Sequence, residues 1–363
     1  MSRIGAVRSV AAASLAAAVI GCQDTTTGPE AVDVFDTRTA TADFEAMDGV
    51  LESSGWASFL ALASRQAFAS AAGPAAASAA IVEAAGRLTG KADARAFAVE
   101  VVRRATRTSG PSAAPIISEG SRGTTFVWDE GAGRYVPDPA RTGAPPTGVR
   151  FILYEESAGR PDPSREVGYV DLIDEGDASR EDVVLRLVGV HRGRTVVDYR
   201  TRVDRVGAGG RVRVDGYLQN DTDRLRFDVD AHAHGGDPDA VDVDFEMGID
   251  ARDFEVVGSV RARGDDGPGA VDVSVRHGDD SLRVTVQDRG PSLAGTFYLD
   301  GAVFATVSGD PDAPTFVSAD GDPLTTLEIG VLFHIVGVVE VVLGLFQGLV
   351  APVAGLVALG IVL

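Results

Sequence analysis

The spacing of hydrophobic positions changes along the chain. From residue 42 to residue 109, apolar residues, mostly alanine, recur with the period of about 3.6 residues that is typical of helices. From residue 123 onward, hydrophobic and polar residues alternate with a period of two over about 200 residues, and Gly/Asp-rich turns separate the alternating runs. The pattern predicts an Ala-rich helical segment at 42–109, a linker at 110–122 and a β domain at 123–322.

The short turns of the β domain predict a meander. Strands that are joined by short turns are antiparallel neighbours, so we expect a long antiparallel β-meander of about 12–14 strands. The alternation gives each strand one apolar face, and the turns set the register of the hairpins. We expect the register to pair Leu218 with Leu225, Ala233 with Val241, and Ile249 with Phe254.

The last part of the chain, residues 323–363, is almost entirely apolar. Because the apolar face of a wide sheet must be hidden from water, we expect these residues to form an apolar helix packed against its concave face. The fold class is then mainly β (α+β), with the meander curled as an open or closed barrel. There are two alternatives: the helix inserts into a membrane, or the β domain forms an outer-membrane barrel. His334, Glu340 and Gln347 would be the buried polar residues of this helix.

The start of the chain has the composition of an export signal. Arg3 and Arg8 supply positive charge, and the stretch "SVAAASLAAAVI" is apolar but shorter than a membrane-spanning helix. A charged start followed by a short apolar run is typical of a secretory signal peptide. We therefore expect the protein to be exported.

The apolar stretch ends in a specific motif, formed by Val19, Ile20, Gly21 and Cys22. This motif resembles the lipobox of bacterial lipoproteins. The resemblance implies that residues 1–21 are a signal peptide, that Cys22 is acylated, and that the lipid holds the protein on the bacterial cell envelope, at the outer membrane. Residues 22–41 would be a flexible tether. Cys22 is the only cysteine of the chain, so an internal disulfide is excluded.

The chain is acidic, with 33 basic and 53 acidic residues and a formal net charge of −20. Binding to nucleic acid, or to an anionic lipid surface through basic patches, requires the opposite charge. We therefore expect a membrane contact through the N-terminal lipid and no nucleic-acid partner.

One pair of histidines has the spacing of a metal site. His232 and His234 lie two residues apart on the polar face of a predicted strand, and the expected register places Asp242 opposite His232. His-x-His with a nearby carboxylate can bind zinc. The same register also places arginines beside the acids, which favours a solvated face with weak ion pairs. The two expected rows across the sheet are Arg211–His232–Asp242–Arg261 and Arg213–Asp230–Asp244–Ser259.

These observations leave three function classes. The first is a non-enzymatic, lipid-anchored envelope lipoprotein that shelters a lipid or other hydrophobic ligand in its β domain. The second is a structural or adhesive surface lipoprotein without a ligand. The third is a metal-dependent hydrolase at His232 and His234, in which zinc, with Asp242 as a further ligand, would be the cofactor. The sequence contains no other catalytic constellation, and we expect no cofactor for the first two classes.

Overall fold

The computed structural model describes residues 37–69, 117, 119–157, 159–176, 183–206, 209–234, 240–263, 269–288, 292–310, 313–326, 328–330, 332, 335, 341–342, 345–346 and 348–350. All of them belong to one compact unit, Phe35–Leu363. Several residues that the sequence singles out lie outside the described residues: Val19, Ile20, Gly21, Cys22, His334, Glu340 and Gln347.

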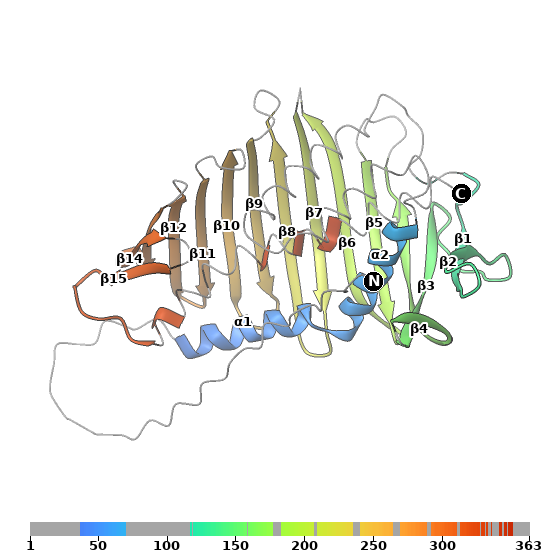
Figure 1. The fold of residues 1–363 in the computed structure, drawn as a ribbon, viewed down its shortest axis with the longest axis horizontal. Coiled ribbons are helices and arrows are strands. Elements are labelled where there is room, and N and C mark those ends of the chain that lie inside the picture. Colours follow the sequence, from blue (N-terminus) through green and yellow to red (C-terminus); the bar gives the residue numbers. More distant parts are fainter. Residues whose placement is uncertain are drawn as a thin grey trace, which may run out of the picture. The chain divides into compact units, whose positions relative to one another are not determined.

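The described strands form one sheet of fifteen strands, seen face-on in Figure 1. From β3 to β15 each strand pairs with the next one in sequence, as a meander should. The protein is therefore mainly β, as predicted. The strands are β1 (Thr124–Asp129), β2 (Arg134–Pro137), β3 (Gly148–Ser157), β4 (Arg160–Asp174), β5 (Val183–His191), β6 (Arg194–Val206), β7 (Gly209–Gln219), β8 (Arg224–Ala233), β9 (Ala240–Ile249), β10 (Phe254–Arg263), β11 (Gly269–His277), β12 (Asp280–Asp288), β13 (Leu293–Leu299), β14 (Ala302–Asp310) and β15 (Ala313–Ser318).

The sheet differs from the prediction in three respects. It is open, with β2 and β15 at its two ends, so the closed-barrel alternative is wrong. It has more strands than expected, because β1, β2 and β15 have only four to six residues and are too short to show clear alternation. It is also not purely antiparallel, because the β1–β2 hairpin folds back and β1 pairs with β3 in parallel.

The predicted hairpin registers are confirmed. Leu218 pairs with Leu225, Ala233 with Val241, and Ile249 with Phe254. Burial follows the same alternation. In β8, for example, every second residue from Leu225 to Ala233 is buried, while the residues between them lie on the more exposed face. The apolar face of the central strands includes Val212, Val214, Leu218, Leu225, Phe227, Val229, Val243, Phe245, Met247, Val256, Val273 and Val284, all buried.

Two helices precede the sheet, α1 (Thr37–Leu51) and α2 (Ser54–Ala69). The Ser53 hydroxyl accepts a hydrogen bond from the Trp56 backbone N–H at 3.3 Å and so caps the start of α2. Helix α1 contacts β7 and β8, and α2 contacts β2, β3, β5 and β6. Helix α1 thus begins within the segment 22–41 that the sequence predicts to be a tether, and residues 70–109 of the predicted helical segment lie outside the described part of the chain.

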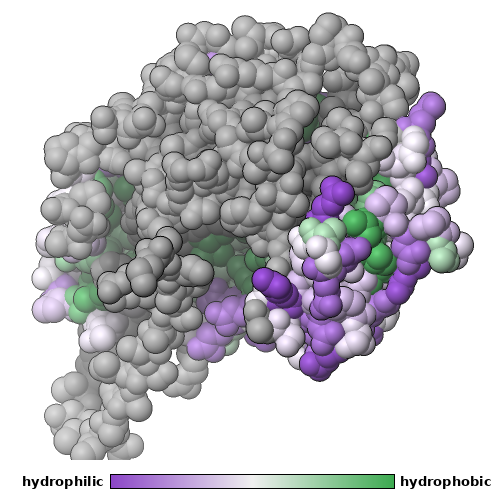
Figure 2. Space-filling model, turned by 45° about the vertical axis from the view of Figure 1, so that its right-hand side comes forward, coloured by the Kyte–Doolittle hydropathy of each residue, from purple (hydrophilic) through white to green (hydrophobic). Residues whose placement is uncertain are grey.

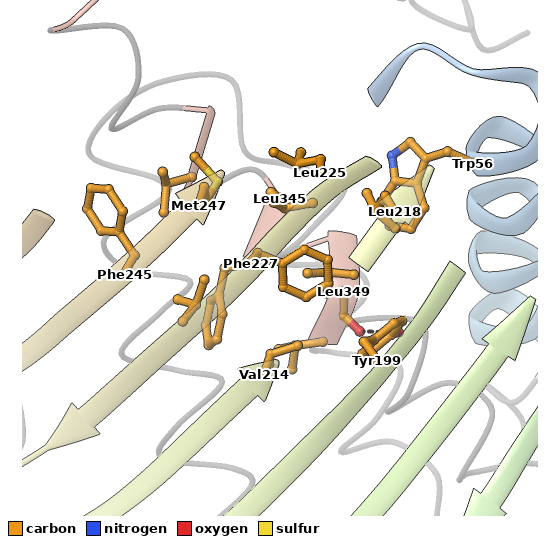
Figure 3. Close-up of a cluster of buried hydrophobic side chains, with 14 of the residues drawn as sticks. Trp56, Tyr199, Val214, Leu218, Leu225, Phe227, Phe245, Met247, Leu345 and Leu349 are labelled. Atoms are coloured by element: carbon orange, nitrogen blue, oxygen red, sulfur yellow. Dashed lines mark hydrogen bonds between the residues drawn. The ribbon is translucent and has the colours of Figure 1, made fainter. Parts of the chain in front are cut away.

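The described residues of the apolar C-terminal segment belong to the same hydrophobic core as the sheet. Figure 3 shows Leu345 and Leu349 among the apolar side chains of the central strands. The Tyr199 hydroxyl, fully buried on β6, donates a hydrogen bond to the Leu349 carbonyl at 2.7 Å. The ring of Phe59 from α2 meets the Tyr199 ring edge-on, with 6.4 Å between centroids. The buried residues of this segment are Leu332, Ile335, Val342, Leu345, Phe346, Leu349 and Val350.

The two faces of the sheet therefore differ in polarity and in burial. The apolar face lies in the core, whereas the other face carries Arg, Asp, Glu, Ser and Thr. Among the coloured residues in Figure 2, hydrophilic ones lie on the outside at the right of the view, and hydrophobic ones lie further in. Within the described part of the chain, no helix combines the length and the apolar character needed to cross a membrane.

Candidate functional site

The polar face of strands β7–β12, called the outer face below, carries a series of arginine–aspartate pairs. Each arginine bonds an acid on a neighbouring strand, and three of the four pairs are bidentate. The pairs are Arg211–Asp230 (Nε to Oδ1 2.8 Å), Arg213–Asp228 (Nε to Oδ1 2.9 Å), Arg261–Asp244 (Nη2 to Oδ1 2.8 Å) and Arg283–Asp272 (Nε to Oδ1 2.8 Å).

The predicted pairing of residues across neighbouring strands is confirmed. The arginine side chains, however, bond acids that lie diagonally from them on the neighbouring strand, not directly opposite. The Cα of Arg211 pairs with His232, as expected, while its guanidinium reaches Asp230. Arg213 stands opposite Asp230 and reaches Asp228 in the same way. Diagonal neighbours on a sheet lie within reach of a long side chain, and a carboxylate is a better acceptor for guanidinium than imidazole is. The hydrogen bond to Asp230 also raises the pKa of Arg211 above its ordinary value, so the pair stays charged.

His232 and His234 lie side by side, and the carboxylate of Asp242, which stands opposite His232 in the register, contacts His234 instead. The rings of His232 and His234 lie 4.7 Å apart between centroids, and Nε2 of His234 is 2.9 Å from Oδ2 of Asp242. The guanidinium of Arg261 lies on the other side of the same carboxylate, 3.6 Å from Oδ1. Among the described residues, no group of three or more His, Cys, Asp and Glu side chains has an arrangement that could hold a metal ion.

We expect the zinc content of the purified protein to be the same before and after both histidines are replaced. Arg261 places a positive charge beside Asp242, which disfavours a divalent cation at this carboxylate. Metal analysis of the purified protein and of the His232→Ala/His234→Ala variant tests this, with Asp272→Ala as a control on the same face. Stoichiometric zinc in the parent protein that disappears only in the histidine variant would instead support the hydrolase class.

The outer face also contains a depression of about 600 Å³. It forms where three small side chains, Val257, Ser259 and Ser274, occupy neighbouring positions on β10 and β11. Longer side chains on β7–β9 and β12 surround them. Val257 is 40 % exposed, although it is hydrophobic and lies on a charged face. The rim of the depression consists of Arg213, Asp228, Asp230, Asp244, Glu246, Asp272 and Arg283.

The rim of the depression carries more acids than arginines. Glu246 stands opposite Asp228, which in turn stands opposite Asp215, so three acids form one row across β7, β8 and β9. Directly opposed like charges are unfavourable, and Arg213 compensates only Asp228 through a direct bond. This arrangement can attract cations and accept hydrogen bonds. The period-two pattern predicts which residues share this face but not the depression, which depends on the relative sizes of neighbouring side chains on four or more strands.

A different kind of ion pair lies near the other end of the sheet. Arg150 on β3 forms a bidentate pair with Asp171 on β4, at 2.7 and 2.8 Å, and stacks over the Tyr169 ring at 3.6 Å. Burial raises the pKa of Asp171, while the hydrogen bonds from Arg150 oppose that shift. The pair satisfies a carboxylate that is 7 % exposed, so we assign it to stability and not to chemistry.

No protein family, curated protein or solved structure matches this chain.

Proposed function

We propose that the chain is a non-enzymatic, lipid-anchored lipoprotein of the bacterial cell envelope, located at the outer membrane. The support for this proposal is the sequence of the leader, where Val19, Ile20 and Gly21 precede the single cysteine, Cys22. The net charge of −20 argues against nucleic acid as a partner. In this proposal Cys22 carries the acyl chains, and the part of the expected tether that precedes Phe35 joins it to the compact unit.

The β domain then serves as a structural or adhesive scaffold without a resident ligand. The observation that supports this role is that the chain's own side chains cover the apolar face. Phe227, Phe245 and Met247 on the sheet are each less than 5 % exposed. We further infer that residues 323–363 form the apolar helix expected from the sequence and cover this face. The burial of Leu345 and Leu349 supports that inference.

A lipid carrier is the second candidate, and one feature of the structure favours it. Among the described residues of the C-terminal segment, the contact with the sheet is apolar apart from the hydrogen bond between Tyr199 and Leu349. Apolar contacts are not directional, so an acyl chain could replace them at little cost. None of the described residues of the C-terminal segment belongs to a strand of the sheet. If these residues moved away from the sheet, no strand pairing among the described strands would be broken.

Mass spectrometry of an organic extract distinguishes the two candidates. The protein is purified with Cys22→Ala, so that covalent acyl chains do not contribute. A scaffold should release less than stoichiometric lipid. A carrier should release stoichiometric lipid, and Phe227→Ala on the apolar face should lower that amount, while Asp228→Ala on the outer face should leave it unchanged.

The lipid anchor itself is tested by Cys22→Ala in a bacterial host that processes lipoproteins. The parent protein should fractionate with membranes, because several acyl chains bind a bilayer stably, at about 0.8 kcal/mol for each buried CH₂ group. The variant should move to the soluble fraction. Thr25→Ala, in the expected tether, is the control and should stay with membranes. A Cys22→Ala protein that remained membrane-bound would contradict the proposal.

A further inference from the structure

Helix α1 carries a buried carboxylate where it passes the turns at one end of the central strands. In Figure 1 the helix runs along the lower ends of the central strands. Its buried side consists of Phe44, Met47 and Val50, together with Asp43, which is only 2 % exposed. A buried carboxylate is costly unless it is paired, so its partners decide how firmly this part of α1 is held.

Two side chains of the sheet meet Asp43. Nδ1 of His277, at the end of β11, lies 2.6 Å from Oδ2 of Asp43. Nη1 of Arg252, in the turn between β9 and β10, lies 3.4 Å from Oδ1. The Phe44 ring packs edge-on against Phe254, with 5.3 Å between centroids, so aromatic contact accompanies the polar one.

Arg252 is shared with a second acid. Its Nε donates to Oδ1 of Asp223, in the turn between β7 and β8, at 3.0 Å, which is shorter than its contact with Asp43. A hydrogen bond from Thr222, together with Arg252, lowers the pKa of Asp223, so this carboxylate stays ionised at neutral pH. The cluster therefore holds two carboxylates and one permanent cation, and a charged imidazolium at His277 would balance it.

Two further acidic residues lie close to His277 in the fold. Asp280 on β12 is its strand partner, and Asp253 in the turn between β9 and β10 accepts the Gly278 N–H through its carbonyl. Arg276, the preceding residue, lies on the opposite face and pairs with Glu255 at 3.5 Å. Among the described contacts, His277 meets the carboxylate of Asp43, and Arg252 is a positive charge that Asp43 shares with Asp223.

We propose that Asp43 and His277 form a protonation-dependent clasp that fastens α1 to the edge of the sheet. In acid the imidazolium pairs with the buried carboxylate and α1 is held. With a neutral imidazole the attraction between the two charges is absent, and its contribution to the docking of α1 is lost. The clasp does not depend on the lipid anchor. If the anchor is also correct, release of the fifteen residues of α1 would extend the tether by up to about 50 Å.

Hydrogen exchange measured by mass spectrometry tests the clasp on the mature chain. Exchange of the α1 peptide is corrected for the intrinsic effect of pH and compared between pH 5.5 and pH 8, with a β8 peptide as the internal reference. We expect α1 to open about tenfold more often at pH 8, which corresponds to the loss of the ion pair between Asp43 and His277. The β8 peptide should show no such change.

Substitutions assign the effect to the two residues. His277→Gln and Asp43→Asn should each remove the pH dependence. His234→Gln is the matched control, because His234 forms a histidine–aspartate pair on the exposed outer face, and it should behave as the parent protein. If the parent protein shows no pH dependence, or if His277→Gln or Asp43→Asn retains it, the clasp does not exist.

Discussion

Truncation of the chain after Thr326 should prevent it from folding. The removed part contains seven described apolar residues that are buried in the core, from Leu332 to Val350. Burial of one such side chain contributes about 1.5–3 kcal/mol, so the loss is on the order of 10–20 kcal/mol. A typical domain has only about 5–15 kcal/mol of net stability. The truncation would also uncover the apolar face of the sheet, and we expect aggregation.

The measurement is the yield of soluble protein, followed by circular dichroism and urea unfolding. The matched control ends at Val350 and keeps every described buried residue of the segment, so it should remain folded and soluble. A truncated chain that stays soluble and unfolds cooperatively would mean that the C-terminal segment is dispensable, and the proposed covering of the apolar face would then be wrong.

Gly216→Ala should destabilise the protein strongly. A Cβ at this position would lie 2.2 Å from the Asp198 carbonyl oxygen and 2.5 Å from the Tyr199 Cα, both backbone atoms that cannot move aside independently. The residue also has a φ of 155°, which side-chain-bearing residues rarely adopt. Steric overlap and backbone strain each cost about 1–3 kcal/mol, so we expect a destabilisation of roughly 3–5 kcal/mol.

Urea unfolding of the purified variant gives the change in the free energy of unfolding. Gly120→Ala is the control, because a Cβ there meets no atom within 4 Å, and it should change stability by less than about 0.5 kcal/mol. Equal stabilities for the two variants would show that β6 and β7 move apart more easily than the close pairing of Gly216 with Tyr199 implies.

Local features of the site could be predicted from the sequence. Period-two alternation placed His232 and Asp230 on one face, and short turns then set which residues stand opposite them. Both are local, because a hairpin register depends on a few residues around one turn. Which acceptor an arginine side chain bonds could not be predicted from local spacing. Arg211 bonds Asp230 instead of His232 because a long side chain selects among several acceptors within reach.

The sequence alone determined the change from helical to strand periodicity, the meander, three hairpin registers and the assignment of an apolar and a polar face. Those properties follow from spacings of a few residues and from the chemistry of turns. The tertiary structure decided that the sheet stays open, that β1 returns to pair with β3, and that small side chains leave a depression beside Glu246. It alone brought Asp43 to His277 and Tyr199 to Leu349, because contacts between residues 150 or more positions apart depend on how whole elements pack, and no local pattern records that.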